Sequence, residues 1–170
     1  ERVAGIIAFN TPILAPTGEP GDLASVMPDF EKMGREHFYH VSWYNADPDG
    51  NVKLLNNNID EFVRKVIWAL SGDYRWVDML EHPSGTSYLA ALPETPPLPW
   101  GWFTQADLDQ YLDAYRQCGF QGVVNHYTSF GLRWSDLTEA QRPKLPANPK
   151  RKIEEPTCFI CGDRDMDLID

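Results

Sequence analysis

The sequence predicts an α/β fold in which a mainly helical segment is inserted between two strands of one sheet. Residues 3–9, VAGIIAF, are a continuous apolar run of the kind found in fully buried strands. A second apolar run occupies residues 157–161, and the apolar residues between the two runs recur mostly at helical spacing. We therefore expect a strand with its exit loop in residues 1–15, a helical domain in residues 16–150, and a returning strand with its loop in residues 151–170. Because a protein rarely begins so close to a central strand, this pattern also indicates a segment of a longer protein.

Composition excludes several classes of partner. The 170 residues are 42% hydrophobic and 24% charged, which is ordinary for a globular domain. The net charge of −10 argues against nucleic acid and anionic membranes, because no basic stripe is present to displace counterions. No run of eighteen apolar residues exists, so we expect no membrane span. The absence of a recognisable signal predicts a cytoplasmic location.

Neither the cysteines nor the acidic end of the chain predicts a metal site. Cys158 and Cys161 have C-x-x-C spacing, but no second cysteine pair and no histidine accompanies them, so we expect buried, inert thiols. An odd total of three cysteines favours a reducing compartment. The aspartates between Asp163 and Asp170 could suggest calcium, but Leu168 stands where an EF-hand loop needs glycine. We expect no metal and no cofactor.

The first part of the helical domain is predicted to contain two helices. Residues 29–44 form one helical pattern, with Tyr39 and Trp43 on the side opposite its main apolar face. A helix that is apolar on two sides should be sandwiched, here between its own domain and a cavity. The sequence at 47–50, Asp-Pro-Asp-Gly, has the composition of a turn. A second amphipathic helix should then start after Asn58.

The second part is predicted to be two helices joined at a glycine. Residues 73–103 are rich in loop-forming residues, and Thr104 with Asp107 then forms a capping-box pattern. Gly119 stands where a helix C-cap is wanted, and helical spacing resumes at once. Tyr127 therefore lies on the inner face of the last helix. From spacing alone, the commoner interpretation of such a tyrosine is a core residue whose hydroxyl finds a nearby acceptor.

The amino-acid sequence of this stretch is more informative than the spacing of its apolar residues. Residues 103–130, FTQADLDQYLDAYRQCGFQGVVNHYTSF, closely resemble the lid, or cap, domain of the α/β-hydrolase-fold epoxide hydrolases. In that family a T-x-x-D-L-D-x-Y segment leads through G-F-x-G to an N-x-Y turn that carries a substrate-binding tyrosine, here Tyr127. Residues 39–43, YHVSW, fit the segment of the family that carries the first lid tyrosine, here Tyr39. The resemblance implies that the chain is a fragment of the α/β-hydrolase fold, a lid inserted between two core strands.

The ends of the chain resemble the same family. The G-D-R-D sequence that ends at Asp165 resembles a family motif whose last aspartate is the acid of the catalytic triad. Some relatives place that acid after the earlier strand, where this chain has Asn10, which cannot take the same role. The resemblance implies an aspartate nucleophile before residue 1 and a histidine base after residue 170. The substrates would be a small-molecule epoxide and water, and the intermediate an aspartyl ester.

Departures from the family pattern leave alternatives open. His40 follows Tyr39 where many epoxide hydrolases carry glutamine, so His40 could replace Tyr39 as a hydrogen-bond donor. Related dehalogenases bind halide with a His-Trp pair at about this place, so a haloacid or haloalkane dehalogenase is the second hypothesis. A non-catalytic interaction module is the third, and a homodimer is possible. Besides His40, the residues expected to line the substrate site are Trp43, Asn125 and His126.

Overall fold

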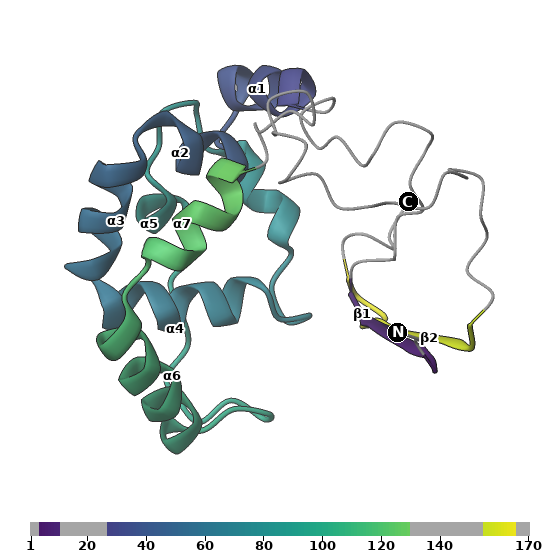
Figure 1. Cartoon of the computed structure of the whole chain (residues 1–170). Coiled ribbons are helices and arrows are strands. Elements are labelled where there is room, and N and C mark those ends of the chain that lie inside the picture. Colours follow the sequence, from purple (N-terminus) through teal and green to yellow (C-terminus); the bar gives the residue numbers. More distant parts are fainter. Residues whose placement is uncertain (1–3, 11–26, 130–154, 166–170) are drawn as a thin grey trace. The chain divides into compact units, whose positions relative to one another are not determined.

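The computed structural model describes residues 4–10, 27–129 and 155–165, which fall into two compact units (Figure 1). One unit is helical and spans residues 27–129. The other is a pair of strands with the loops that follow them. Within the described residues, no helix is long and apolar enough to cross a membrane.

The strand unit contains β1, Ile6–Phe9, and β2, Thr157–Ile160, which pair in parallel with Ile6 opposite Thr157 and Phe9 opposite Ile160. The two predicted strands are therefore neighbours in one sheet. Parallel strands end at the same edge, so the residues that follow Phe9 and Ile160 come together there. The expected full burial is not found among the described residues, since Phe9 is 65% exposed and the Cys158 thiol is also exposed.

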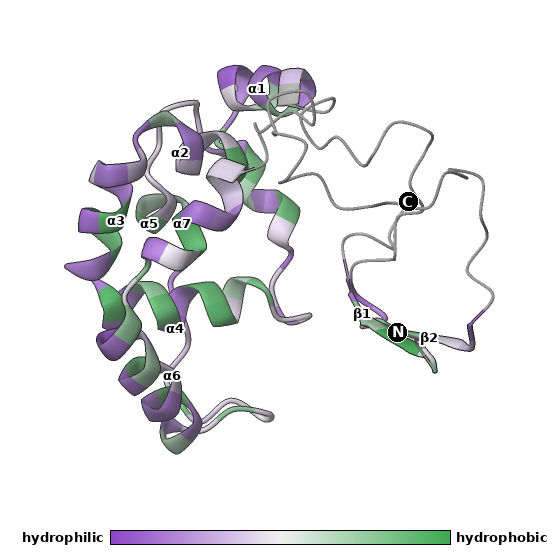
Figure 2. Ribbon diagram, viewed as in Figure 1, coloured by the Kyte–Doolittle hydropathy of each residue, from purple (hydrophilic) through white to green (hydrophobic). Residues whose placement is uncertain are grey.

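The helical unit packs its apolar faces into one core. Its elements, shown in Figure 1, are α1 (Met27–Glu36), α2 (His40–Ala46), α3 (Pro48–Asn56), α4 (Ile59–Ala69), a 3-10 helix (Trp76–Glu81), α5 (Tyr88–Ala91), α6 (Gln105–Cys118) and α7 (Gln121–Thr128). Hydrophobic residues run along α4 (Figure 2), which is the amphipathic helix expected from the sequence. The largest fully buried side chains come from different elements: Phe38, Leu55, Val63, Met79, Phe120 and Val124. Burying each such side chain stabilises the fold by about 1.5–3 kcal/mol.

The single helix predicted over residues 29–44 is wrong, because the chain breaks after Glu36. Tyr39 has extended backbone angles and precedes α2 as its N-cap residue. The break lets Phe38 enter the core, where its N–H donates to the carbonyl of His82 at 2.8 Å. It also lets α2 fold back against α1 at Gly34, where an added Cβ would lie 2.3 Å from the Ser42 side chain. Tyr39 and Trp43 are therefore not two residues of one continuous helix.

The turn predicted at residues 47–50 is also wrong, because these residues begin α3. The Asp47 side chain accepts a hydrogen bond from the Gly50 N–H at 3.1 Å, as an N-cap does, and Pro48 takes the first helical position. Asp-Pro-Asp-Gly is compatible with both a turn and a helix start. The helical sequence that follows decides between them.

The two helices predicted after residue 103 are confirmed. Thr104 and Asp107 form the expected reciprocal capping box of α6. Gly119 is the C-cap of α6, as predicted, and has φ 64° and ψ −170°, so its φ is positive but its ψ is not that of a left-handed helix. The Asn56 side-chain oxygen accepts the Phe120 N–H at 3.0 Å and so fixes the start of α7 to the end of α3. The short helix expected near residues 135–141 lies outside the described residues.

Candidate active site

Helix α7 carries Tyr127 and packs against α2 and α3 (Figure 1). The Tyr127 ring stacks face to face on the ring of Tyr44, with 4.4 Å between centroids and 9° between planes. The Asn45 side-chain amide donates to the backbone carbonyl of Tyr127 at 3.3 Å and to that of Val41 at 2.8 Å. Helix α2 therefore holds both the ring and the backbone of the predicted lid tyrosine.

His40 lies between the two predicted tyrosines. Its ring is edge-on to Tyr127 at 5.4 Å and contacts Tyr39 at 5.1 Å, measured between ring centroids. A third ring, that of Trp76, packs edge-on against the same imidazole at 5.3 Å. The break after α1 is what allows this arrangement, because it places Tyr39 and His40 at the very start of α2. The structure thus brings Tyr39, His40 and Tyr127 into one cluster.

The surroundings of His40 keep its imidazole uncharged. Burial lowers the pKa of His40 from 6.5 to about 4, because desolvation disfavours the cation. Its Nδ1 atom is buried and has no hydrogen-bond partner among the described residues. At neutral pH the ring is therefore a neutral group, with one nitrogen able to donate and the other able to accept a hydrogen bond.

The phenols around His40 remain protonated at neutral pH. Burial raises the pKa of Tyr127, since desolvation disfavours the phenolate. Burial also raises the pKa of Tyr44 and of Tyr88, which lie in the same cluster and interact electrostatically with Tyr127. A hydrogen bond from the Trp76 side chain acts on Tyr88 in the opposite direction. These phenols are therefore neutral at neutral pH, and a neutral hydroxyl group is the kind of donor that stabilises an oxygen gaining negative charge.

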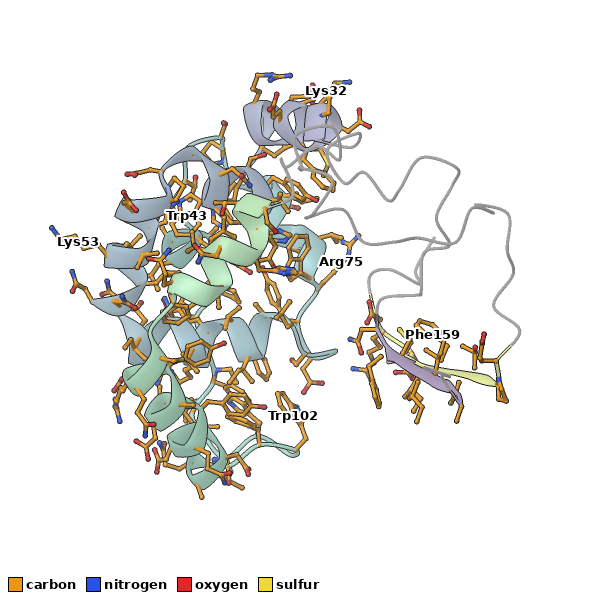
Figure 3. All side chains as sticks on the ribbon, viewed as in Figure 1. Lys32, Trp43, Lys53, Arg75, Trp102 and Phe159 are labelled. Carbon is orange, nitrogen blue, oxygen red and sulfur yellow. The ribbon has the colours of Figure 1, made fainter. Side chains whose placement is uncertain are left out.

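The other residues expected to bind substrate do not lie equally close to this cluster. Trp43 lies within the helical unit (Figure 3) and is half-buried, with its ring against Tyr44 and Tyr88. Asn125 and His126 are exposed on α7. The Asn125 side chain accepts a hydrogen bond from Gln121 one turn earlier, and the His126 ring lies edge-on to that of Tyr127, with 5.2 Å between centroids.

Asp165 belongs to the strand unit, where it meets Asn10. The Asn10 side-chain amide donates to Asp165 Oδ2 at 2.8 Å. Both residues follow the carboxyl end of a strand, β1 for Asn10 and β2 for Asp165. The two positions at which the family resemblance allows a triad acid are therefore in direct contact in this chain.

Comparisons with known proteins point to one family. No family model matches the chain. It is 26% identical over 167 residues, or 97% of its length, to epoxide hydrolase A of Mycobacterium tuberculosis (strain ATCC 25618 / H37Rv). It is 36% identical over 76 residues, 45% of its length, to epoxide hydrolase 3 of Siraitia grosvenorii, of which it covers 21%. The crystal structure of epoxide hydrolase A from Mycobacterium thermoresistibile superposes with a TM-score of 0.71 over 95% of this chain, at 22% sequence identity. The chain is therefore similar in sequence to epoxide hydrolases over nearly its whole length, and it shares the fold of the corresponding part of a solved α/β-hydrolase epoxide hydrolase.

The match covers part of each epoxide hydrolase. The chain spans about half the length of the relative that it matches throughout, 47% of epoxide hydrolase A from M. tuberculosis, and 46% of the solved M. thermoresistibile chain. The fold of this part, helices with a small parallel pair of strands, is that of the lid region of an α/β-hydrolase epoxide hydrolase.

Three residues of this cluster were not identified as site residues from the sequence. Tyr44 belongs to a helical pattern and has the appearance of an ordinary core residue. Trp76 and Tyr88 stand in the loop-rich stretch, where no periodicity indicates which side chains point inward. The one available signal was composition, since the chain has six tryptophans and seven tyrosines and such residues gather in apolar sites.

Proposed function

We propose that the protein is an epoxide hydrolase that adds water to an epoxide through an aspartyl-ester intermediate, and that Tyr39 and Tyr127 are its lid donors. The observation that carries this proposal is the contact of both tyrosine rings with one neutral imidazole, that of His40. Two phenols held around one point can share the oxygen of a single small substrate. The names of the relatives support the same reaction class.

The first step opens the ring. An aspartate carboxylate outside residues 1–170 attacks one epoxide carbon, the bond between that carbon and the epoxide oxygen breaks, and an ester bond forms to the enzyme. The oxygen that leaves becomes an alkoxide, which is a poor leaving group in water. A hydrogen bond or a proton from Tyr127 and Tyr39 stabilises it, and any phenolate formed regains its proton from solvent. Because burial raises the pKa of Tyr127, this donor stays protonated at neutral pH.

The second step releases the diol. A histidine outside residues 1–170 takes a proton from water, the oxygen of that water adds to the ester carbonyl, and the acyl C–O bond breaks. The leaving alkoxide takes the proton of the carboxylic acid that forms, which gives the diol and restores the carboxylate, and the imidazolium returns its proton to solvent. In this proposal Asp165 accepts a hydrogen bond from the histidine and stabilises the imidazolium. The lid tyrosines thus act in the first step, and Asp165 in the second.

The experiment is diol formation from styrene oxide by the full-length protein and its Tyr127→Phe variant. Removing one donor to a developing oxyanion costs about a hundredfold or more in rate, so we expect a loss of that size. Tyr111→Phe is the matched control, because Tyr111 is half exposed on α6 and carries no role in the proposal. Wild-type turnover in Tyr127→Phe, with Tyr111→Phe also active, would remove the tyrosine from the mechanism.

The second donor is identified with the same assay. Tyr39 and His40 are neighbours in sequence and both reach the cluster, and a neutral imidazole can also donate. We expect Tyr39→Phe to slow ring opening more than His40→Gln does. The reverse order would assign the donor role to His40.

One observation favours a dehalogenase as the second candidate. The Trp76 ring packs edge-on against His40, so the fold supplies a His-Trp contact that is not adjacent in the sequence. Against this candidate, the imidazole is uncharged at neutral pH and the Trp76 side chain already hydrogen-bonds Tyr88. Halide release from a short haloacid, without diol formation from styrene oxide, would favour the dehalogenase.

A further inference from the structure

We propose that Asn10 is a positioning residue that fixes the orientation of the Asp165 carboxylate. This inference rests on the proposed function, in which Asp165 orients the histidine base. The Asn10 amide donates to Asp165 Oδ2 at 2.8 Å, which is a well-formed hydrogen bond to a charged acceptor. It joins residues 155 positions apart in the sequence.

The backbones of both residues are anchored, so their side chains meet at defined places. The Asn10 N–H donates to the carbonyl of Ile160 at 3.0 Å, which extends the pairing of β1 with β2 by one residue. The Asp165 N–H donates to the carbonyl of Gly162 at 3.2 Å, which closes the turn after β2. The amide and the carboxylate therefore project from one edge of one sheet.

The conformation of Asn10 restricts which residues can stand there. Its φ of 59° lies in the left-handed region, which glycine, asparagine and aspartate adopt most readily. Glycine has no side chain to donate. Aspartate would place a second carboxylate against Asp165, where like charges repel. Asparagine is the residue that combines this backbone conformation with an N–H donor.

The bond sets the orientation of the carboxylate. With Oδ2 held by Asn10, the plane of the carboxylate is set, and with it the direction from which the carboxylate accepts an imidazole N–H. Asp165 acts through the histidine, and the histidine activates water in the second step. Loss of Asn10 should therefore slow hydrolysis of the ester and leave ring opening nearly unchanged.

The test uses the full-length protein with Asn10→Gly. Glycine keeps the positive φ without strain and removes only the donor. Rapid-quench mass spectrometry with styrene oxide follows the ester intermediate and the diol separately. We expect the ester to accumulate, its hydrolysis to slow about tenfold or more, and ring opening to stay within about twofold of the wild type.

Asp163→Asn is the control, since Asp163 is an exposed residue of the same loop and should leave both steps unchanged. Wild-type ester hydrolysis in Asn10→Gly would overturn the positioning role while leaving the proposed function intact. Equal slowing of both steps would also overturn it, because that result is the mark of a purely structural role. If the wild type forms neither ester nor diol, the proposed function fails and the inference fails with it.

Discussion

Burial of His40 links the candidate site to the stability of the helical unit. The imidazole titrates near 6.5 when exposed, and burial in the fold lowers its pKa to about 4. Between these two values the unfolded chain binds the proton and the folded chain does not, so protonation favours unfolding. This contribution to stability is present above pH 6.5 and is lost as the pH falls toward 4. A site that requires a neutral imidazole is therefore less stable in acid.

We predict that the free energy of unfolding of the His40→Gln variant falls less between pH 7 and pH 4.5 than that of the wild type. The shift of the His40 pKa corresponds to a loss of about 2 kcal/mol between pH 7 and pH 4.5, and a glutamine does not titrate. Urea unfolding of the 170-residue chain at several pH values, followed by circular dichroism, measures the difference. His126→Gln, an exposed substitution of the same kind, should keep the wild-type slope. Parallel profiles for wild type and His40→Gln would show that His40 is not the group responsible.

At the scale of the elements, the junction between α6 and α7 decides where Tyr127 stands. Gly119 has φ 64° and ψ −170°, a region that is nearly exclusive to glycine. Its missing side chain also leaves room for the Asn56 amide, which holds the first N–H of the α7 segment at Phe120. The sequence indicates that a helix ends at Gly119, but it does not indicate that Asn56 accepts the Phe120 N–H, because Asn56 lies more than sixty residues earlier.

We predict that Gly119→Ala destabilises the chain and Gly122→Ala does not. At Gly119 an added Cβ would lie 3.1 Å from the Asn56 side-chain oxygen and would impose a strained backbone, a cost of about 1–3 kcal/mol. At Gly122, inside α7, nothing lies within 4 Å of an added Cβ, and alanine is the better helix former. Thermal unfolding of both variants measures the contrast. Equal melting temperatures would mean that the junction tolerates other conformations.

Local chemistry explains which elements were predictable. The capping box at Thr104 and Asp107 and the glycine at 119 are signals within a few residues, and the structure confirms α6 and α7. The break between α1 and α2 has no local signal of that strength. It depends on the burial of Phe38 and on the contact of Gly34 with Ser42, both of which exist only after the helices pack.

At the scale of the whole molecule, the candidate residues fall in two units, the tyrosines in the helical unit and Asp165 in the strand unit. The sequence and its family resemblance single out Tyr39, Tyr127 and Asp165, and the structure places the tyrosines around His40 and Asp165 against Asn10. The contacts that surround them could not be predicted. Stacking of Tyr44 on Tyr127 requires two helices to pack together, and the Asn10 bond requires two distant strands to pair.

The strand unit has apolar side chains exposed to solvent, which argues for association. Ile7 and Phe9 on β1 are both 65% exposed, and Phe159 (Figure 3) and Ile160 on β2 are 42% and 47% exposed. Among the described residues, each strand pairs only with the other, so each has a second edge that can accept another strand. Apolar surface next to open strand edges is typical of an interface.

We predict that the 170-residue chain self-associates through these strands and that the double substitution Ile7→Thr and Phe9→Thr weakens the association. Threonine keeps the β-strand preference while removing most of the apolar surface. Sedimentation velocity over a range of concentrations should show larger species for the wild type and a shift toward monomer for the double variant. Leu70→Thr is the matched control, because Leu70 is also 65% exposed but lies at the end of α4. If Leu70→Thr disperses the chain as well as the double variant does, the strands are not the specific interface and general surface hydrophobicity drives the association.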